Sequence, residues 1–423
     1  MKQGREFNFP GWVSGLNNIA REDLLDPRQL RKATNVDLLP GGHPRRRQGY
    51  TKVLGDGYYH SLFATPNYLV FVKDGTLCVT NDAVNVEEVA EDVRELTGVV
   101  INDEFYFSDG QTTGILSTEG RLRPLGIISP SRQPFVSAAS EGGLFEGYYQ
   151  VAITYLADDG RESGTGQAES VSVPEGGGIS LSDIPQPEQG EVVAVRIYAS
   201  DPNGENLYFR TSVPVGQTSY ELGYLKSKKK LNTQFHQAMP AGDHFQFANG
   251  RLYAAVSNTL VFSNAMNFGQ YHSTDGYLMF ATALVGFAAS DTGVFVSDQT
   301  KVYFLEGTNP EQFSRREVQP SPAQRGTMTT VDGGLFNETL AGTRTPVWWA
   351  QEGHLVIGLP DGTIQRINEA DVAIPQYERG AVAEVHREGV KQLVSVMKNP
   401  GMRSSTAFED SATIEVHRNG IEI

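Results

Sequence analysis

The feature that most constrains this chain is a recurring pair of apolar-alternating segments joined by a tight turn. Residues 68–80 alternate on either side of Asp74-Gly75, and residues 250–262 and 293–305 repeat the pattern. Apolar residues with period two place one face of a strand inward and the other outward. Two such strands around an Asp-Gly pair predict a β-hairpin. Because one hairpin cannot bury its own apolar face, recurring hairpins predict a radial or stacked β architecture.

Six of these units are predicted, two in the first part of the chain and four in the second. Units of roughly 40 residues have the size of β-propeller blades. A stacked solenoid is the alternative, although solenoid repeats are usually shorter and more regular. The 45 glycines and 21 prolines are typical of a chain with many turns and few long helices.

An insertion interrupts the series between the second and third units. The distance from Phe105 to Leu252 exceeds one unit by roughly a hundred residues, and the extra segment has its own short strands at intervals of about 10 residues. This spacing predicts an immunoglobulin- or fibronectin-like β-sandwich, without the Cys-Trp-Cys pattern of antibody domains. The predicted fold class is therefore all-β, a β-propeller of about six blades with an inserted sandwich.

The predicted domain boundaries follow from these shifts in pattern. Residues 1–55 form an irregular N-terminal arm, with a short helix capped at Asp26, that runs along the repeats or reaches a neighbouring subunit. Residues 56–131 and 241–397 form the two parts of the propeller, and residues 132–240 form the sandwich. Residues 398–423 are expected to supply a closing or exchanged strand.

Composition restricts the class of protein. No stretch approaches the roughly 20 apolar residues that span a bilayer, and the N-terminus lacks the apolar core of a signal peptide. The single cysteine, Cys78, excludes an internal disulfide framework and fits folding in a reducing cytosol. The net charge of −15 argues against a general DNA-binding surface. This negative charge has two interpretations: it keeps the protein soluble, or it forms a surface that repels nucleic acid.

No strong catalytic signature occurs, and the eight histidines lack metal-ligand spacing. We therefore expect no enzyme activity, no catalytic residue, no metal and no cofactor. Trp348-Trp349 begins an alternating strand, which predicts one ring facing inward and one facing outward. Two basic runs are either solvated loops or contacts with an acidic partner subunit or DNA. The candidate contact residues are Arg45, Arg46, Arg47, Lys228, Lys229 and Lys230.

The order of several segments resembles bacteriophage tail proteins. The segments are 15–24, 33–38 and 44–50 near the start, then 293–310, 325–327 and 348–350. Together they are similar to the nozzle or tail-hub proteins of short-tailed phages, also called packaged-DNA stabilisation proteins. The resemblance covers most of the chain, but its motifs are turns and strands, so it brings no catalytic residues with it.

The resemblance implies a structural role in the virion, in a protein made in the bacterial host cytoplasm. Members of this family form rings, typically of six copies, below the adaptor and portal, with tail fibres or a tail needle as further neighbours and double-stranded DNA passing through. Loops between blades would then form a gate for the genome. The candidate gate loops are 264–276, with Asn267 and Tyr271, and 307–324, with Asn309 and Gln312.

Two other functions stay open from the sequence. A glycan-binding or glycan-cleaving β-propeller, such as a host-surface recognition protein, would need acids and arginines that converge in the fold. A cell-surface adhesion protein would fit a propeller joined to a sandwich, but it would need a route out of the cell other than a signal peptide.

Overall fold

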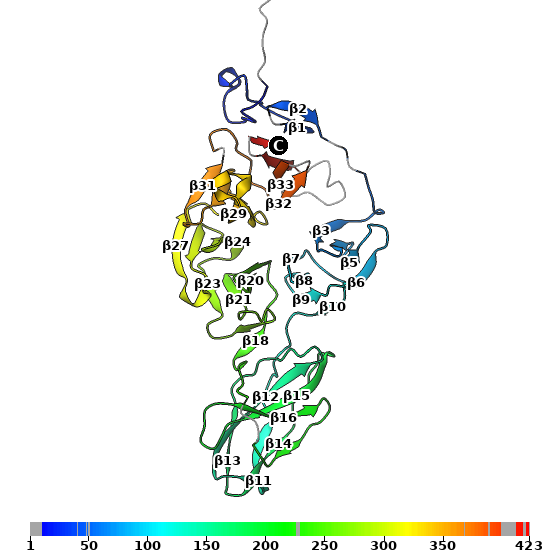
Figure 1. Ribbon diagram of the computed structural model, residues 1–423, viewed down its shortest axis with the longest axis vertical. Coiled ribbons are helices and arrows are strands. Elements are labelled where there is room, and N and C mark those ends of the chain that lie inside the picture. The colour runs from blue at the N-terminus through cyan, green and yellow to red at the C-terminus, as the bar shows by residue number, and fades with distance from the viewer. Residues whose placement is uncertain are drawn as a thin grey trace, which may run out of the picture.

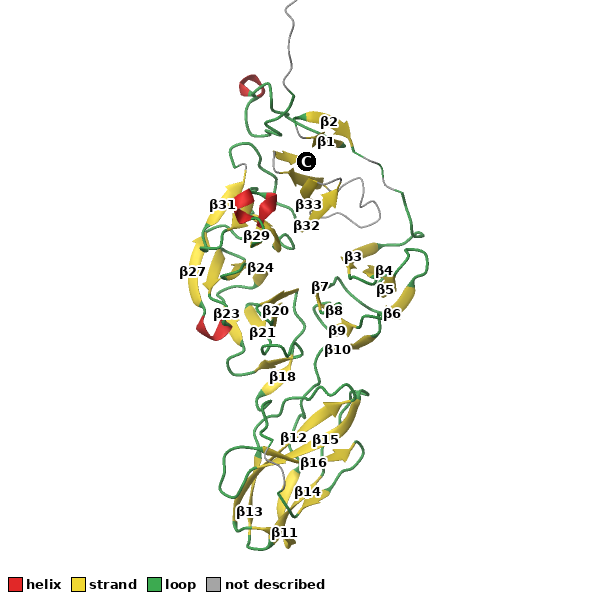
Figure 2. Cartoon of the chain, in the orientation of Figure 1, coloured by secondary structure: helices red, strands yellow, loops and turns green. Residues whose placement is uncertain are grey.

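The computed structural model describes residues 11–39, 41–47, 49, 51–225, 229–367, 369–387, 390–398, 412–417 and 420–422. Strands and loops make up nearly all of this part of the chain, and the helices in it are short 3-10 turns (Figure 2). The fold class is all-β, as predicted. The four-stranded sheets lie radially around a centre, which is the β-propeller architecture, and a separate body projects from one side of this ring (Figure 1).

Six four-stranded antiparallel sheets of the described chain form the ring, each following chain order from its first strand to its last. Sheets 1 to 3 have these strands: β3 (Tyr59–Ala64), β4 (Leu69–Lys73), β5 (Thr76–Thr80), β6 (Glu87–Ala90); β7 (Thr97–Ile101), β8 (Glu104–Ser108), β9 (Thr113–Leu116), β10 (Leu122–Pro124); β19 (His244–Ala248), β20 (Arg251–Val256), β21 (Thr259–Phe262), β23 (Tyr277–Met279).

Sheets 4 to 6 complete the ring. Their strands are β24 (Leu284–Ala289), β25 (Gly293–Asp298), β26 (Val302–Glu306), β27 (Ser314–Gln319); β28 (Thr329–Asp332), β29 (Arg344–Trp349), β30 (Leu355–Gly358), β31 (Ile364–Ile367); β32 (Arg379–Arg387), β33 (Val390–Lys398), β34 (Ala412–His417), β35 (Gly420–Glu422).

The Asp74-Gly75 turn that the sequence predicts is present in sheet 1, and a second turn of the same kind joins β19 to β20 in sheet 3. Asp74 and Gly75 both have positive φ, 51° and 86°, as do Asn249 and Gly250 at 50° and 73°. Two successive residues in this region make a type I′ turn, whose twist matches that of the strands it joins. The Asp-Gly and Asn-Gly pairs therefore set the register of sheets 1 and 3.

Neighbouring sheets pack face to face, so the central strands are buried on both sides. All six residues of β25 are buried. Val294 and Val296 pack toward sheet 3, whereas Phe295 packs toward sheet 5. The same arrangement corrects the expectation for Trp348 and Trp349, because both rings are fully buried. Trp348 lies between sheets 4 and 5, and Trp349 between sheets 5 and 6.

Two serine side chains, here called serine clamps, form hydrogen bonds between one sheet and the connection to the next. The Ser108 hydroxyl at the end of β8 accepts a hydrogen bond of 3.0 Å from the Gly242 amide, which leads into sheet 3. The Ser297 hydroxyl in β25 accepts one of 2.9 Å from the Ala323 amide, which leads into sheet 5. Both serines are fully buried. Each clamp therefore supplies a partner for a backbone amide of the connection to the next sheet.

The C-terminal segment supplies the last two strands of sheet 6, where β34 pairs with β33 and β35 pairs with β34. That this segment closes the ring or is exchanged with a neighbouring copy stays a prediction. Arg379 of β32 forms an ion pair with Glu95, which lies in the connection from sheet 1 to sheet 2.

The N-terminal arm lies against the last two sheets. Its elements are η1 (Glu22–Leu24), β1 (Val36–Leu39) and β2 (His43–Arg46). The helix expected at Asp26 is a turn instead, in which the Asp26 carboxylate accepts from the Arg28 amide at 2.8 Å. Leu16 is buried in the cluster between sheets 5 and 6, and the Asn17 amide donates to Asp371 at 2.7 Å.

The insert is a two-layer β-sandwich. One layer has the strand order β11-β14-β17 and the other β13-β12-β15-β16, and a single apolar cluster fills the space between them. The strands are β11 (Phe135–Leu144), β12 (Gly147–Ala157), β13 (Glu169–Val173), β14 (Gly177–Ser182), β15 (Val192–Ala199), β16 (Tyr208–Pro214) and β17 (Tyr220–Leu222). The remaining elements are β18 (His236–Ala238), β22 (Gln270–His272), η2 (Pro310–Gln312), η3 (Gly333–Leu335) and η4 (Glu338–Leu340).

Candidate functional site

The structure places the two predicted basic runs far apart. Arg45 and Arg46 lie in β2 of the N-terminal arm, whereas Lys229 and Lys230 lie in the insert at the opposite end of the molecule (Figure 1). Lys228 lies outside the described residues. The two runs therefore do not form one site, and any partners they have are different ones.

The members of each run also differ in accessibility. Arg47 forms a nearly buried ion pair with Asp37 at 3.1 Å, with side-chain exposures of 11% and 5%. This arginine holds the arm hairpin together. Arg46, Lys229 and Lys230 are exposed. Lys230 also forms a β-bridge with Tyr208, so its backbone continues the edge of the sandwich.

The first gate segment, 264–276, is not the long loop that was expected. Asn267 is in a tight turn, where its amide donates to the Asn264 carbonyl at 3.2 Å. Tyr271 lies in β22, which pairs with β18, and its hydroxyl donates to Gln237 at 3.3 Å. This segment therefore belongs to the junction between ring and insert.

The second gate segment, 307–324, is also mostly ordered. Asn309 precedes η2 and Gln312 ends it. The following residues form β27, the outermost strand of sheet 4. The expectation of a long loop is wrong here too, because sheet 4 takes its fourth strand from this segment. That either segment gates a channel stays a prediction.

The junction between ring and insert is a site that the sequence did not indicate. Arg161 of the insert donates to the carbonyls of Pro124 and Leu125, at the end of sheet 2, over 2.6 and 2.9 Å. Gln189 donates to the Gly126 carbonyl at 3.1 Å. On the other side, Gln270 of β22 donates to the Glu162 carbonyl. These hydrogen bonds hold both of the segments that connect the insert to the ring. They therefore restrain the orientation of the insert relative to the ring.

Two histidines face each other across the β18–β22 ladder of this junction. His236 and His272 are directly paired, with ring centroids 5.3 Å apart. Asn264 donates to His236 at 3.0 Å, and Asp275 lies 2.6 Å from His272. Burial, followed by the charge of His272, lowers the pKa of His236. Protonation of both rings would place like charges on opposed residues, which destabilises a strand pair.

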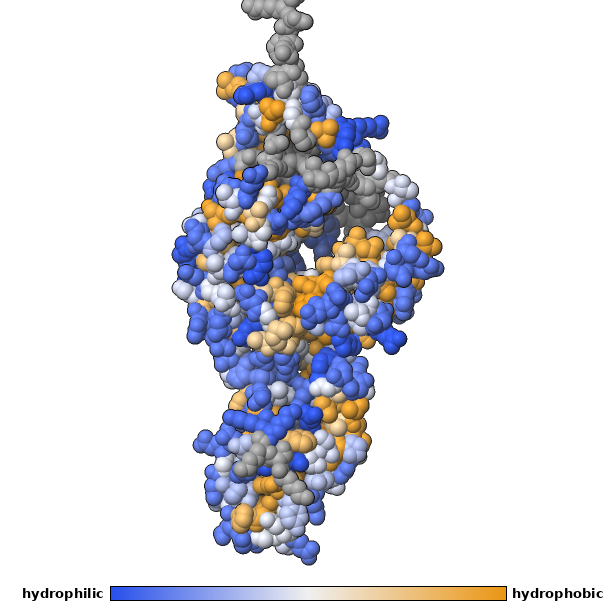
Figure 3. All heavy atoms as spheres, in the orientation of Figure 1, coloured by the Kyte–Doolittle hydropathy of each residue, from blue (hydrophilic) through white to orange (hydrophobic). Residues whose placement is uncertain are grey.

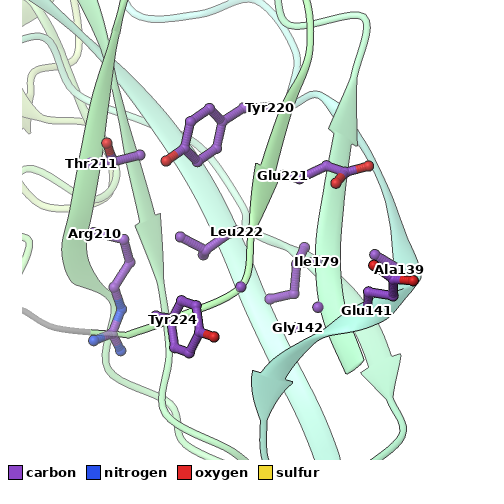
Figure 4. A pocket seen from close by; sticks show the side chains of 12 residues that line it. Ala139, Glu141, Gly142, Ile179, Arg210, Thr211, Tyr220, Glu221, Leu222 and Tyr224 are labelled. Carbon is purple, nitrogen blue, oxygen red and sulfur yellow. The ribbon is translucent and has the colours of Figure 1, made fainter. Parts of the chain in front are cut away.

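A groove opens in the insert, at the edge strands β16 and β17 (Figure 4). Its volume is about 530 Å³, within the range of roughly 300–1,000 Å³ that is usual for small-ligand sites. Strands β11 and β14 and the two residues after β17 supply the other lining residues. The lining includes Glu141, Gly142, Arg210, Thr211, Tyr220, Glu221 and Tyr224. No signal in the sequence marked them, because they are brought together from four separate segments.

Within the described chain no group of three or more histidine, cysteine, aspartate or glutamate side chains is placed to hold a metal ion. None of the helices there has the length and apolar character that a membrane crossing requires. Cys78 is buried in β5, and burial raises the pKa of its thiol.

Comparisons with known proteins give a loose similarity in fold. No protein-family model matches the chain, and no curated protein matches it. Among solved structures it is similar to BBS1N in complex with ARL6DN, at 12% identity and a TM-score of 0.35, over 86% of this chain and 93% of that one. The Dos1 propeller gives 10% identity and a TM-score of 0.35, over 88% and 81%. The Neurospora crassa Pan2 WD40 domain gives 10% and 0.31, over 80% and 86%. Similarities this loose say nothing about the function of this chain.

Proposed function

We propose that this chain is a non-enzymatic structural protein of a short-tailed phage tail. In this proposal its six sheets are the blades of a six-bladed propeller, and the insert is an immunoglobulin- or fibronectin-like domain. Copies of the chain, six by the resemblance, form a nozzle or hub ring below the adaptor. The ring retains the genome and then lets it leave.

The observation that carries the proposal is the two-ended, restrained shape of the molecule. The N-terminal arm packs on sheets 5 and 6 at one end, and the insert projects at the other (Figure 1). Hydrogen bonds from Arg161 and Gln270 hold the insert on both of its connections. A protein stacked between an adaptor and fibres needs two separate contact surfaces at a constant distance, and this shape supplies them.

Two further features support this function. The resemblance to tail proteins rests on segments that the structure places in the arm and in sheets 4 and 5. The net charge of −15 would weaken the counterion-release binding that could stall DNA in a conduit. Figure 3 shows hydrophilic residues over much of the face in view, with apolar patches beside the central opening of the ring. We place subunit contacts at the arm, where Arg46 is exposed, since the ring must close by a heterologous interface.

The test is ring assembly by the purified full chain, alone and with the adaptor and portal proteins, followed by negative-stain microscopy and mass photometry. We expect rings with a central opening and a mass near six copies. Arg46→Glu should reduce ring formation. Arg121→Glu, which reverses an exposed charge between β9 and β10 of sheet 2, should not. A chain that stays monomeric with its neighbours, or that is absent from the tail of labelled virions, would contradict the proposal.

A further inference from the structure

The groove of the insert has a floor that only glycine permits. A Cβ atom at Gly142 would lie 2.3 Å from the Gly177 carbonyl oxygen, and one at Gly178 would lie 2.8 Å from the Glu141 carbonyl oxygen. The register of β11 against β14 shifts between Ala139 and Leu144, which marks a bulge at this point. Side chains at these positions would collide with the backbone of the facing strand, so the close approach of β11 and β14 at the floor of the groove requires glycine.

Aromatic rings line one side of the groove. Tyr220, Leu222 and Tyr224 all line the groove, and Tyr220 and Leu222 project from β17 to the same side in Figure 4. Tyr220 is partly buried against the sandwich core, whereas Tyr224 is 68% exposed. The Tyr224 ring lies over Gly143, since a Cβ there would come within 2.6 Å of it. An exposed ring beside a concave surface is a flat apolar contact with a polar tip.

Carboxylates lie on the other side of the groove. Glu141 and Glu221 are exposed lining residues, and Thr211 adds a hydroxyl. The one cation of the lining, Arg210, has a side chain only 1% exposed. Its guanidinium donates to the Ala199 carbonyl and to Asp201, both at 2.9 Å. The charge that the groove presents to solvent is therefore negative.

These features select a class of ligand. An anionic ligand, such as nucleic acid or a sialylated glycan, would meet two carboxylates and an arginine already paired with Asp201. A pyranose ring has one apolar C–H face and a rim of hydroxyl groups. The C–H face suits a tyrosine ring, and the hydroxyls can donate to carboxylates. We infer that this groove binds a neutral glycan, with Tyr224 as the stacking residue and Glu141 as a hydrogen-bond acceptor.

The test begins with the purified full chain on an array of neutral and sialylated oligosaccharides, and continues with calorimetry on the neutral oligosaccharide that binds best. Tyr224→Ala should weaken binding by roughly tenfold or more, as loss of an aromatic anchor does. Glu141→Gln should weaken it by about two- to fivefold, because the amide is a weaker acceptor than the carboxylate. Circular dichroism spectra would verify that each variant is folded.

Tyr148→Ala is the matched control. Tyr148 is also 68% exposed and lies in the insert, but it does not line the groove. We expect this variant to bind as the parent does. Equal losses in both tyrosine variants, a preference for sialylated glycans, or no binding to any neutral oligosaccharide at millimolar concentration would each overturn the inference. Ring assembly is measured separately, so failure here leaves the proposed tail function standing, and the reverse also holds.

Discussion

At the scale of single residues, His244 is a group whose titration should influence the free energy of unfolding. Its ring packs edge-on against Phe287, with centroids 4.7 Å apart, and its Nε2 lies 2.9 Å from the Phe287 carbonyl oxygen. Burial lowers its pKa from 6.5 to about 4. The folded chain therefore favours the neutral ring. In the unfolded chain the ring is half protonated at pH 6.5 and becomes mostly protonated below it.

This difference predicts a loss of stability on acidification. The contribution of neutral His244 is complete above pH 6.5 and is lost progressively down to about pH 4. The shift corresponds to at most about 3.5 kcal/mol, since one pKa unit is about 1.4 kcal/mol. Urea unfolding at several pH values should show the stability of the parent falling over this window. His244→Gln should flatten the dependence, and His43→Gln, at an exposed position in β2, should not. Identical slopes in the His244 variant and the parent would refute this assignment.

The tryptophan pair shows where residue-level prediction fails. Alternation correctly placed Trp348 and Trp349 on opposite faces of a strand, but both faces are covered by neighbouring sheets. Each ring also has a polar partner. The Trp349 indole donates to the Ser395 hydroxyl at 2.9 Å, and the Trp348 indole donates to Gln319 at 3.2 Å. Periodicity identifies faces, but what covers a face depends on residues far away in the chain.

At the scale of elements, the serine clamps stabilise the contact between one sheet and the connection to the next. Ser297→Ala would leave the Ala323 amide without the hydroxyl that accepts its hydrogen bond in a buried environment. The cost of such an unsatisfied group is about 1–3 kcal/mol. Chemical denaturation should therefore show Ser297→Ala less stable than the parent by that amount.

Ser172→Ala supplies the comparison, because this serine is exposed in β13. It should change the stability by less than about 0.5 kcal/mol. A Ser297→Ala variant as stable as the Ser172→Ala variant would show that water or a shifted backbone satisfies the Ala323 amide. The serines at 108 and 297 are visible in the sequence, but their partners lie 134 and 26 residues later, so the clamp itself is not.

At the scale of the whole molecule, the junction decides whether the insert is a rigid extension or a loose appendage. Arg161→Ala removes the donors to the Pro124 and Leu125 carbonyls. We expect hydrogen exchange to rise at residues 122–128 and 159–163, while the amides of the ring sheets stay protected. The distribution of interatomic distances from small-angle X-ray scattering should become broader. Arg132→Ala, which removes an exposed ion pair with Asp183 inside the insert, should leave these measurements unchanged. Unaltered exchange in Arg161→Ala would mean that the other junction contacts suffice.

The sequence by itself determined the all-β class, the recurring hairpins and the interruption after the second unit. Those features depend on local physics: the period of apolar residues and the turn residues that accept positive φ. Only the tertiary structure decided that both tryptophans are buried, that the C-terminal strand completes sheet 6, that the expected gate segments contain β22 and β27, and that the residues of the groove meet. Each of these depends on contacts between segments far apart in the chain, and such contacts leave no periodic signal in either segment.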